Sequence, residues 1–410
     1  MALLKGNAVV GQSGGPTAAI NATLSGVIRG VSSENSLIGK LYGMKNGIEG
    51  FMKEDFSDLS SFFENEKKLK SLEETPSSFL GSCRMKLPKL SDDDRIYVKI
   101  FSIFEKYDIK YFYYIGGNDS MDTVMKLDGY AKKIGYEIKI IGVPKTIDND
   151  IPITDHTPGY GSAAKFVATA VKEIARDSSV YTLKSVIIVE IMGRDSGWLT
   201  AAAALPKALT GNGADLVYLP ERVFDEERFI RSVEEKLDIC PHVVVAVSEG
   251  IKYKNGRYVA EGLKNEVEDD FGHKILAGVA RSLERMIKKE IGCKVRAVEL
   301  NVLQRCSAHI LSLTDIKESI RVGKRAVIYS VSGQSGKMMA FRRREGNYRV
   351  DIVAVDVSLA ANKVKYVPDE FINENGDGVT EKCIEYVKPL IAGERKIKYE
   401  DGMPVHITLE

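Results

Sequence analysis

Short apolar runs recur along the chain, and each one stops at glycine or at polar residues. The runs cover residues 8–10, 111–115, 138–143, 185–191 and 243–247. Continuous stretches of β-branched residues suit strands that are buried on both faces, as in a parallel sheet. We therefore predict that these runs are strands of mainly parallel sheets.

Amphipathic segments alternate with the predicted strands. Residues 162–176 place apolar side chains at helical spacing, and Ser162 stands where it would cap that helix. A similar stripe begins at Ile20, after the first strand. This alternation predicts an open, doubly wound α/β fold, in which ligands sit at the carboxyl ends of the strands. The polar residues after each strand should therefore face one cleft, or one cleft per domain.

Length and charge narrow the class of protein. A chain of 410 residues is too long for one ordinary core, so we expect two α/β domains. With 58 basic and 57 acidic residues, it is not built mainly to hold nucleic acid or an anionic membrane. No apolar stretch is long enough to span a membrane, and the first residues do not resemble a signal peptide. The five scattered cysteines indicate a reduced, cytoplasmic protein without a zinc site.

The loop after the third predicted strand has the densest chemistry. It reads Pro144-Lys-Thr-Ile-Asp-Asn-Asp150, which places a cation, a hydroxyl and two carboxylates close together. A phosphoryl-transfer site uses all of them: the cation holds phosphate, and carboxylates hold metal and act as base. The alternative is a solvated turn with local side-chain hydrogen bonds.

Other glycine-rich turns are weaker signals. Residues 11–15 follow a strand and precede a helix, so they suit a phosphate or simply form a tight turn. Residues 159–164 match a dinucleotide fingerprint but lack the preceding strand, which argues against a nicotinamide dehydrogenase. Residues 373–378 resemble the start of a calcium loop, but the twelfth position of that loop is Ile384 where a glutamate ligand is needed. We interpret all five histidines as structural or surface residues.

Taken together, several segments resemble the phosphofructokinase family, and the resemblance extends from Gly11 to about residue 394. The segments with this similarity are 11–21, 79–84, 115–120, 143–150, 154–161, 189–198 and 304–305. The resemblance implies two Rossmann-like domains with the active site in the cleft between them. It places a phosphoryl-donor domain at about 1–158 plus 304–356, and a sugar-phosphate domain at about 159–303 plus 357–410.

At two positions the chain is similar to the pyrophosphate-using branch of that family. Asp119 and Lys145 stand where ATP-using members have glycine. Asp119 would place bulk and negative charge where the α-phosphate of ATP would lie, and Lys145 would add a cation for the compact charge of pyrophosphate. The alternatives are an ATP-dependent 6-phosphofructokinase or related sugar-phosphate kinase, and a non-catalytic subunit that only binds sugar phosphate.

The resemblance also implies a reaction: reversible transfer of a phosphoryl group from pyrophosphate to the 1-hydroxyl of fructose 6-phosphate. Asp148 is then the general base, and Lys145 and Asp119 complete the catalytic group. Mg²⁺ would lie at Asn118 and Asp119, although Asn118 is neutral where many members have aspartate. The implied substrate-binding residues are Gly14, Arg84, Thr146, Asp150, Met192, Gly193, Arg194, Glu249, Arg296 and Arg305.

In the bacterial ATP-using members a neighbouring subunit supplies arginine to the sugar 6-phosphate, so the resemblance implies a homo-oligomer, either a dimer or a tetramer, with a shared active site. Arg296 matches one of two arginines that a neighbouring subunit supplies to the sugar phosphate. Ser185 occupies the place of the other, with Lys184 beside it. Asn301 and Val302 also depart from the family pattern, which puts one sugar contact in doubt.

Overall fold

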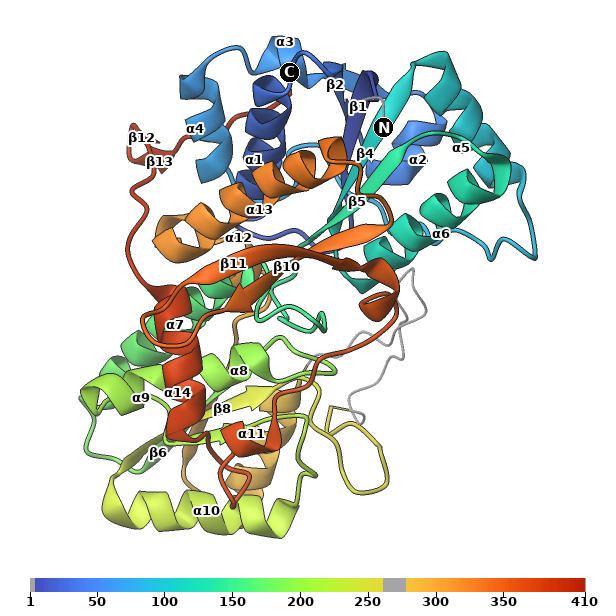
Figure 1. Ribbon diagram of the computed structural model, residues 1–410. Coiled ribbons are helices and arrows are strands. Elements are labelled where there is room, and N and C mark those ends of the chain that lie inside the picture. The colour runs from blue at the N-terminus through green and yellow to red at the C-terminus, as the bar shows by residue number, and fades with distance from the viewer. Residues whose placement is uncertain (1–3, 261–277, 410) are drawn as a thin grey trace.

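The computed structural model describes residues 4–260 and 278–409. It contains two main sheets, which Figure 1 shows one above the other. The larger sheet has the strand order β11-β10-β5-β4-β1-β2-β3 and the smaller has the order β7-β8-β6-β9. Both are mainly parallel, since only β2–β3 and β10–β11 pair in antiparallel fashion within them. The predicted mixed α/β, mainly parallel fold is therefore confirmed.

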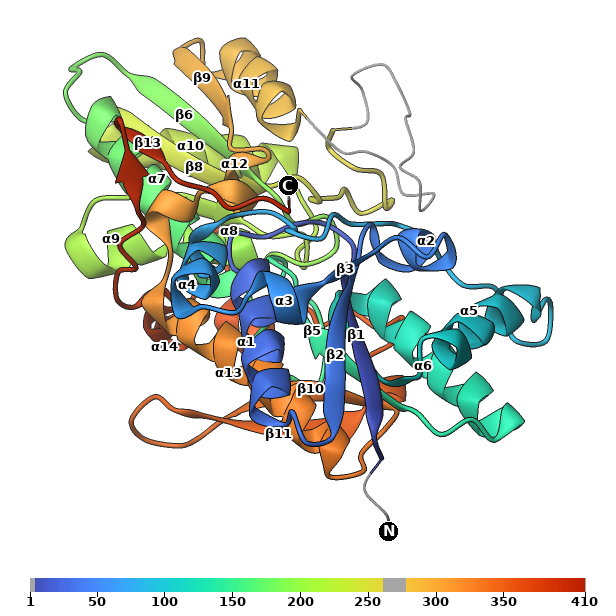
Figure 2. The ribbon, with the colours of Figure 1, turned by 90° about the horizontal axis from the view of Figure 1, so that it is seen from above.

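The larger sheet combines the first third of the chain with a late segment. Its strands are β1 (Gly6–Gln12), β2 (Ile38–Met44), β3 (Phe56–Asp58), β4 (Ile109–Gly116), β5 (Lys139–Pro144), β10 (Lys337–Arg343) and β11 (Val350–Asp356). One face packs on α1 (Ile20–Ser33), α3 (Leu59–Phe62), α4 (Glu66–Glu74) and α13 (Leu313–Val331). The other face packs on α2 (Gly47–Met52), α5 (Arg95–Lys106) and α6 (Asn118–Ile134). Figure 2 shows α1 and α13 on one side of β1 and β2, with α5 and α6 on the other.

The smaller sheet is also covered on both faces. Its strands are β6 (Ser185–Ile191), β7 (Leu216–Tyr218), β8 (His242–Ser248) and β9 (Lys294–Glu299). One face packs on α7 (Tyr160–Ser178), α8 (Trp198–Ala202), α9 (Leu205–Thr210) and α14 (Glu381–Val387). The other packs on α10 (Glu226–Ile239) and α11 (Val279–Glu290). The remaining elements are α12 (Leu303–Cys306), the hairpin β12–β13 (Tyr399–Glu400 and Met403–Pro404) and short 3₁₀ turns at Ala308–Ile310, Val357–Leu359, Asp369–Phe371 and Lys388–Ile391.

The five strands predicted from apolar runs are all present, as β1, β4, β5, β6 and β8. The predicted helix at 162–176 is also present, but Ser162 does not cap it. The helix begins at Tyr160, and the buried N–H groups of Gly159 and Ser162 at its N-terminus donate to the carboxylate of Asp315 at 2.9 Å each. Asp315 belongs to the first turn of α13, so the cap comes from a distant part of the chain.

None of the described helices is both long and apolar enough to cross a membrane. The loops that carry most of the predicted site residues follow the strands of the two sheets. Because β1, β4 and β5 run parallel, the loops that follow them leave the same edge of the larger sheet. The loops after β6 and β8 leave the corresponding edge of the smaller sheet.

Candidate active site

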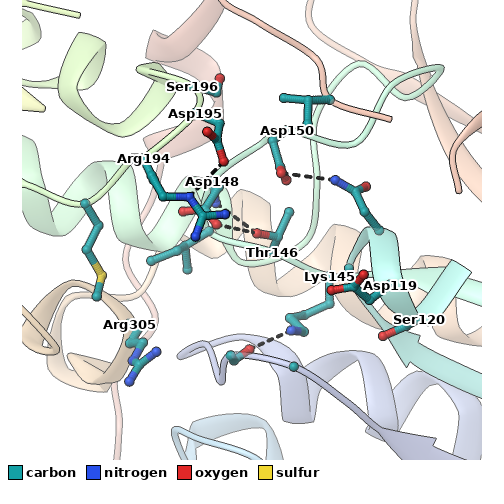
Figure 3. A pocket seen from close by; sticks show the side chains of 18 of the residues that line it. Asp119, Ser120, Lys145, Thr146, Asp148, Asp150, Arg194, Asp195, Ser196 and Arg305 are labelled. Carbon is teal, nitrogen blue, oxygen red and sulfur yellow. Dashed lines mark hydrogen bonds and ion pairs between the residues drawn. The ribbon is translucent and has the colours of Figure 1, made fainter. Parts of the chain in front are cut away.

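The loops at these two edges line one cavity of about 720 Å³. Figure 3 shows its side chains converging from both sheets. Every site residue predicted from the sequence lies in its wall, with the exception of Arg296. The residues so placed are Gly14, Arg84, Asn118, Asp119, Lys145, Thr146, Asp148, Asp150, Met192, Gly193, Arg194, Glu249 and Arg305.

Asp148 lies in the turn that follows β5, and Thr146 orients it. The Thr146 hydroxyl donates to Asp148 Oδ2 at 3.2 Å and accepts the Asp148 backbone N–H at 3.1 Å. Burial raises the pKa of Asp148 above its usual range, while the Thr146 hydrogen bond and the charge of Lys145 oppose that rise. The turn therefore holds a half-buried carboxylate of increased basicity facing the cavity.

Asp150 is the second carboxylate of the same turn. Its Oδ2 accepts a hydrogen bond from Asn118 Nδ2 at 3.1 Å, which joins the loop after β5 to the start of α6 (Figure 3). The pKa of Asp150 is raised to about 7, mainly by burial and secondly by the negative charge of Asp148. Two carboxylates in such proximity favour the sharing of a proton or of a cation.

Lys145 lies at the floor of the cavity with only 2% of its surface exposed. Its ammonium donates to the backbone carbonyl of Gly15 at 2.5 Å (Figure 3). Gly14 adopts φ +75°, a left-handed conformation that suits glycine and brings the backbone of this turn close to the ammonium. Burial lowers the pKa of Lys145 to about 8, so the group is still mainly protonated at neutral pH. A compact anion over the 13–16 turn would meet this cation directly.

Asp119 occupies the first turn of α6 and lines the same cavity as Lys145. Its carboxylate forms an ion pair with Lys86 at 3.2 Å, and both residues line the cavity. Negative side chains are favourable at a helix N-terminus, so Asp119 suits this position in α6. A longer phosphate chain that extended toward Asp119 would meet this carboxylate.

The opposite wall is formed by the loops of the smaller sheet. Arg194 follows β6 and pairs with Asp195 through Nε at 2.9 Å. Glu249 follows β8 and accepts the backbone N–H of Gly193 at 3.2 Å. A side chain at Gly250 would collide with the backbone carbonyl of Arg194, so glycine allows the two loops to touch. Burial raises the pKa of Glu249 to about 7.

Asn118 is suited to hold a hard cation. Its Oδ1 is buried and has no hydrogen-bond partner among the described residues. An amide oxygen beside the Asp119 carboxylate matches the oxygen ligands that Mg²⁺ prefers. In the described part of the chain, no three His, Cys, Asp or Glu side chains cluster as a metal site. A cation here would therefore take part of its coordination from bound phosphates.

Arg296 lies on β9 and lines a separate small hollow together with Ser185 and Lys294. That location is outside the cavity that is lined by the other predicted residues.

Several cavity residues were not predicted: Lys86, Asp195, Ser196, Asn362 and Val364. Three of them lie within two residues of a predicted arginine in the sequence: Lys86, Asp195 and Ser196. The segment around Asn362 has no sequence feature that indicates a site.

Comparison with known proteins agrees with this geometry. A family model described as phosphofructokinase matches residues 7–328. The chain belongs to the phosphofructokinase family. Phosphotransferases of this family generally use a divalent metal, which is consistent with the oxygen atoms at Asn118 and Asp119. The family predicted from the sequence is thus confirmed.

Near full-length relatives indicate the branch of the family. The chain is 40% identical over 401 residues to a pyrophosphate–fructose 6-phosphate 1-phosphotransferase of Halomonas elongata, covering 97% of this chain and 94% of that protein. The corresponding protein of Methylococcus capsulatus is 40% identical over 406 residues, covering 98% and 96%. The crystal structure of a pyrophosphate-dependent phosphofructokinase from Nitrosospira multiformis matches with a TM-score of 0.89 and 35% identity, covering 98% and 96%.

Proposed function

We propose that this phosphofructokinase transfers a phosphoryl group reversibly from pyrophosphate to the 1-hydroxyl of fructose 6-phosphate, giving fructose 1,6-bisphosphate and phosphate. The observation that supports this donor most directly is that Lys145 and Asp119 both line the same cavity. Buried Lys145 offers a cation to a short, dense anion. Asp119, paired with Lys86, opposes any donor that continues beyond its second phosphate.

In this reaction Asp148 removes the proton of the sugar 1-hydroxyl. Its raised pKa brings it closer to the working pH, which favours proton transfer by a carboxylate. Thr146 keeps the carboxylate pointed at the hydroxyl. Lys145, Arg84 and the backbone of Gly14 bind the transferred and leaving phosphates, which neutralises charge as the phosphoryl group moves.

On the sugar side, Arg194 and Arg305 bind the fructose 6-phosphate, since both are cations in the cavity wall. Glu249, Met192, Gly193 and Thr146 contact the sugar. Asn118 Oδ1 and Asp119 hold Mg²⁺, with Asp150 supporting Asn118 through their hydrogen bond. The bound ion supplies positive charge that offsets the charge of the phosphates.

The site is shared between subunits of a cytoplasmic homo-oligomer, either a dimer or a tetramer. The placement of Arg296 outside the cavity of its own chain supports a role in the site of a neighbouring copy. Pyrophosphate binds to a phosphoryl-donor domain at about 1–158 plus about 304–356. Fructose 6-phosphate binds to a sugar-phosphate domain at about 159–303 plus about 357–410. Mixing an Arg296→Ala chain with an Asp148→Asn chain tests the sharing: activity above that of either alone supports it, and no recovery contradicts it.

One assay tests the reaction itself. Purified protein is given fructose 6-phosphate and Mg²⁺ with either pyrophosphate or ATP. We expect fructose 1,6-bisphosphate to form with pyrophosphate, and a much lower kcat/KM with ATP. Preference for ATP, or equal use of the two donors, would overturn the assignment of the donor.

A further inference from the structure

The turn that bears both site carboxylates continues into a strained loop. Asn149 adopts φ +54° and Ile153 adopts φ +67°, although neither is glycine. A β-branched residue such as Ile153 rarely takes a left-handed conformation. Residues in such conformations persist only where their surroundings over-determine them, and they are concentrated at functional sites. Some group must therefore hold residues 149–155 in place.

Lys365 provides this support from a distant segment. Its ammonium donates to Asn149 Oδ1 at 3.2 Å, to the carbonyl of Thr154 at 3.2 Å and to the carbonyl of Asp155 at 2.8 Å. These acceptors lie at both ends of the strained loop. One side chain thus uses all three of its donors on the backbone and side chains of a single turn.

The backbone of Lys365 ties the same turn to the opposite wall of the cavity. Its N–H donates to the carbonyl of Asp150 at 2.7 Å. Its carbonyl accepts from the Ser196 hydroxyl at 3.1 Å and from the Trp198 indole N–H at 3.0 Å. Ser196 follows Arg194 by two residues, so Lys365 connects the loop of the carboxylates to the loop of the arginine.

Asn149 is the residue of the turn whose side chain the Lys365 ammonium contacts. Its side chain is fully buried and also donates to the Tyr386 hydroxyl at 2.9 Å. Asn149 is therefore fixed from two sides, and it lies directly between Asp148 and Asp150 in the chain. Rotation of this residue would turn both carboxylates, because they are its immediate neighbours.

We propose that Lys365 is a positioning residue: it holds the left-handed turn at Asn149 so that Asp148 faces the sugar hydroxyl. This inference rests on the proposed function, because it assigns Lys365 an effect exerted through Asp148. Lys365 is not among the residues that line the cavity, so we expect no contact with substrate. Its loss should slow the chemical step and leave ground-state binding of both substrates nearly unchanged.

The first test compares two lysines of one segment. We expect Lys365→Met to lower kcat on the order of 10–100-fold, the range for a misplaced reacting group. KM for fructose 6-phosphate and for pyrophosphate should change by no more than about threefold, because the binding contacts remain. Lys363→Met is the matched control, since Lys363 is an exposed lysine two residues away. It should retain the wild-type kcat.

The second test separates positioning from a merely structural role. In an Asp148→Asn background the base is already lost, so Lys365→Met should lower kcat little further. A structural contribution independent of Asp148 would reduce kcat by the same factor in both backgrounds, and that result would overturn the proposal. Wild-type kcat in a folded Lys365→Met variant, or an effect confined to KM, would overturn it as well.

If Lys365→Met does not fold, Asn149→Gly decides the question. Glycine adopts the positive φ without a steric cost but lacks the amide that Lys365 and Tyr386 hold. A lowered kcat with little change in KM supports the proposal, and a wild-type kcat contradicts it. The wild-type enzyme is assayed in parallel with pyrophosphate: if it is inactive the proposed function fails, whereas if it is active only the inference about Lys365 is tested.

Discussion

The hydroxyl of Thr146 and the carboxylate of Asp148 hold each other in place across one turn. Thr146 Oγ1 donates to the carboxylate at 3.2 Å and accepts the backbone N–H of Asp148 at 3.1 Å. This reciprocal pair resembles the local side-chain bonds of an ordinary polar turn. Here it has a different consequence, because the turn opens into the cavity and the oriented carboxylate is half-buried.

Replacing Asp148 with asparagine should preserve the fold and remove the base. The amide is nearly isosteric and can keep a hydrogen bond to Thr146, but it cannot take a proton. We expect kcat to fall by on the order of 10²–10⁴, the range of general-base catalysis. Steady-state kinetics with pyrophosphate measures this, and a melting temperature near that of the wild type verifies the fold. An Asp148→Asn enzyme with wild-type kcat would show that another group is the base.

Replacing Arg194 with alanine should weaken binding of the sugar phosphate far more than binding of pyrophosphate. Arg194 follows β6 on the wall of the smaller sheet, opposite the turn of Lys145. Loss of a charge-assisted contact costs about 1.5–3 kcal/mol, so KM for fructose 6-phosphate should rise roughly 10–150-fold. KM for each substrate is measured at saturation with the other. A rise confined to pyrophosphate would place Arg194 at the wrong substrate.

Lys145→Gly should mostly abolish the use of pyrophosphate. The variant loses the buried ammonium that lies 2.5 Å from the Gly15 carbonyl, next to the proposed phosphate position. We expect kcat/KM for pyrophosphate to fall by about tenfold or more, the effect of one lost charged contact. An exposed lysine such as Lys363 provides the control, because its removal leaves the cavity unchanged. Undiminished pyrophosphate activity would refute the role of Lys145.

Asp119→Gly should act on the other donor. The change removes bulk and negative charge from the cavity wall, so ATP should gain kcat/KM while pyrophosphate changes less. Only the double variant with Lys145→Gly should prefer ATP, since one change removes an obstacle and the other removes an attraction. Measuring both donors across the wild type, the singles and the double tests this. An Asp119→Gly enzyme that still excludes ATP would contradict the prediction.

Glu249 should make binding of the sugar depend on pH. Burial raises the pKa of its carboxyl to about 7, so the group becomes protonated as the pH falls below that value. A protonated Glu249 accepts fewer hydrogen bonds from sugar hydroxyls, and KM for fructose 6-phosphate should rise between pH 8 and pH 6 (about one unit either side of that pKa). Glu249→Gln should remove this dependence of KM on pH. If KM of that variant still rises between pH 8 and pH 6, the dependence comes from the phosphate group of the substrate.

The same raised pKa has a consequence for stability. Because the folded state binds the Glu249 proton more tightly than the unfolded state, this group favours folding at low pH and opposes it as the pH rises through about 7. Glu249→Gln should therefore become more stable relative to the wild type as the pH is raised. The difference should grow as the pH rises from about 4.5, the ordinary pKa of glutamate, to about 7, and it should stay constant above that; thermal unfolding of both proteins over this range measures it.

Local sequence patterns predicted five of the strands and two of the helices, and the family resemblance predicted the residues of the cavity wall around Asp148. Five apolar runs became β1, β4, β5, β6 and β8, because a continuous β-branched run is a local property that burial then satisfies. The loops after these strands converge for a topological reason: parallel strands place their carboxyl ends at one edge. This rule brings Asp148 and Lys145 to one edge of the larger sheet, and Arg194 and Glu249 to one edge of the smaller sheet. The packing of the two sheets then brings the two edges together around one cavity.

The contacts that join distant segments of the chain could not be predicted from the sequence. Ser162 stands where a local cap should be, yet Asp315 accepts the N–H groups of that helix from α13. Lys365 reaches the 149–155 turn from more than two hundred residues away in the chain. Arg296 has the residue type of a phosphate ligand but lies on the far strand β9. Such contacts depend on how the two sheets pack, and no local pattern of residues encodes that arrangement.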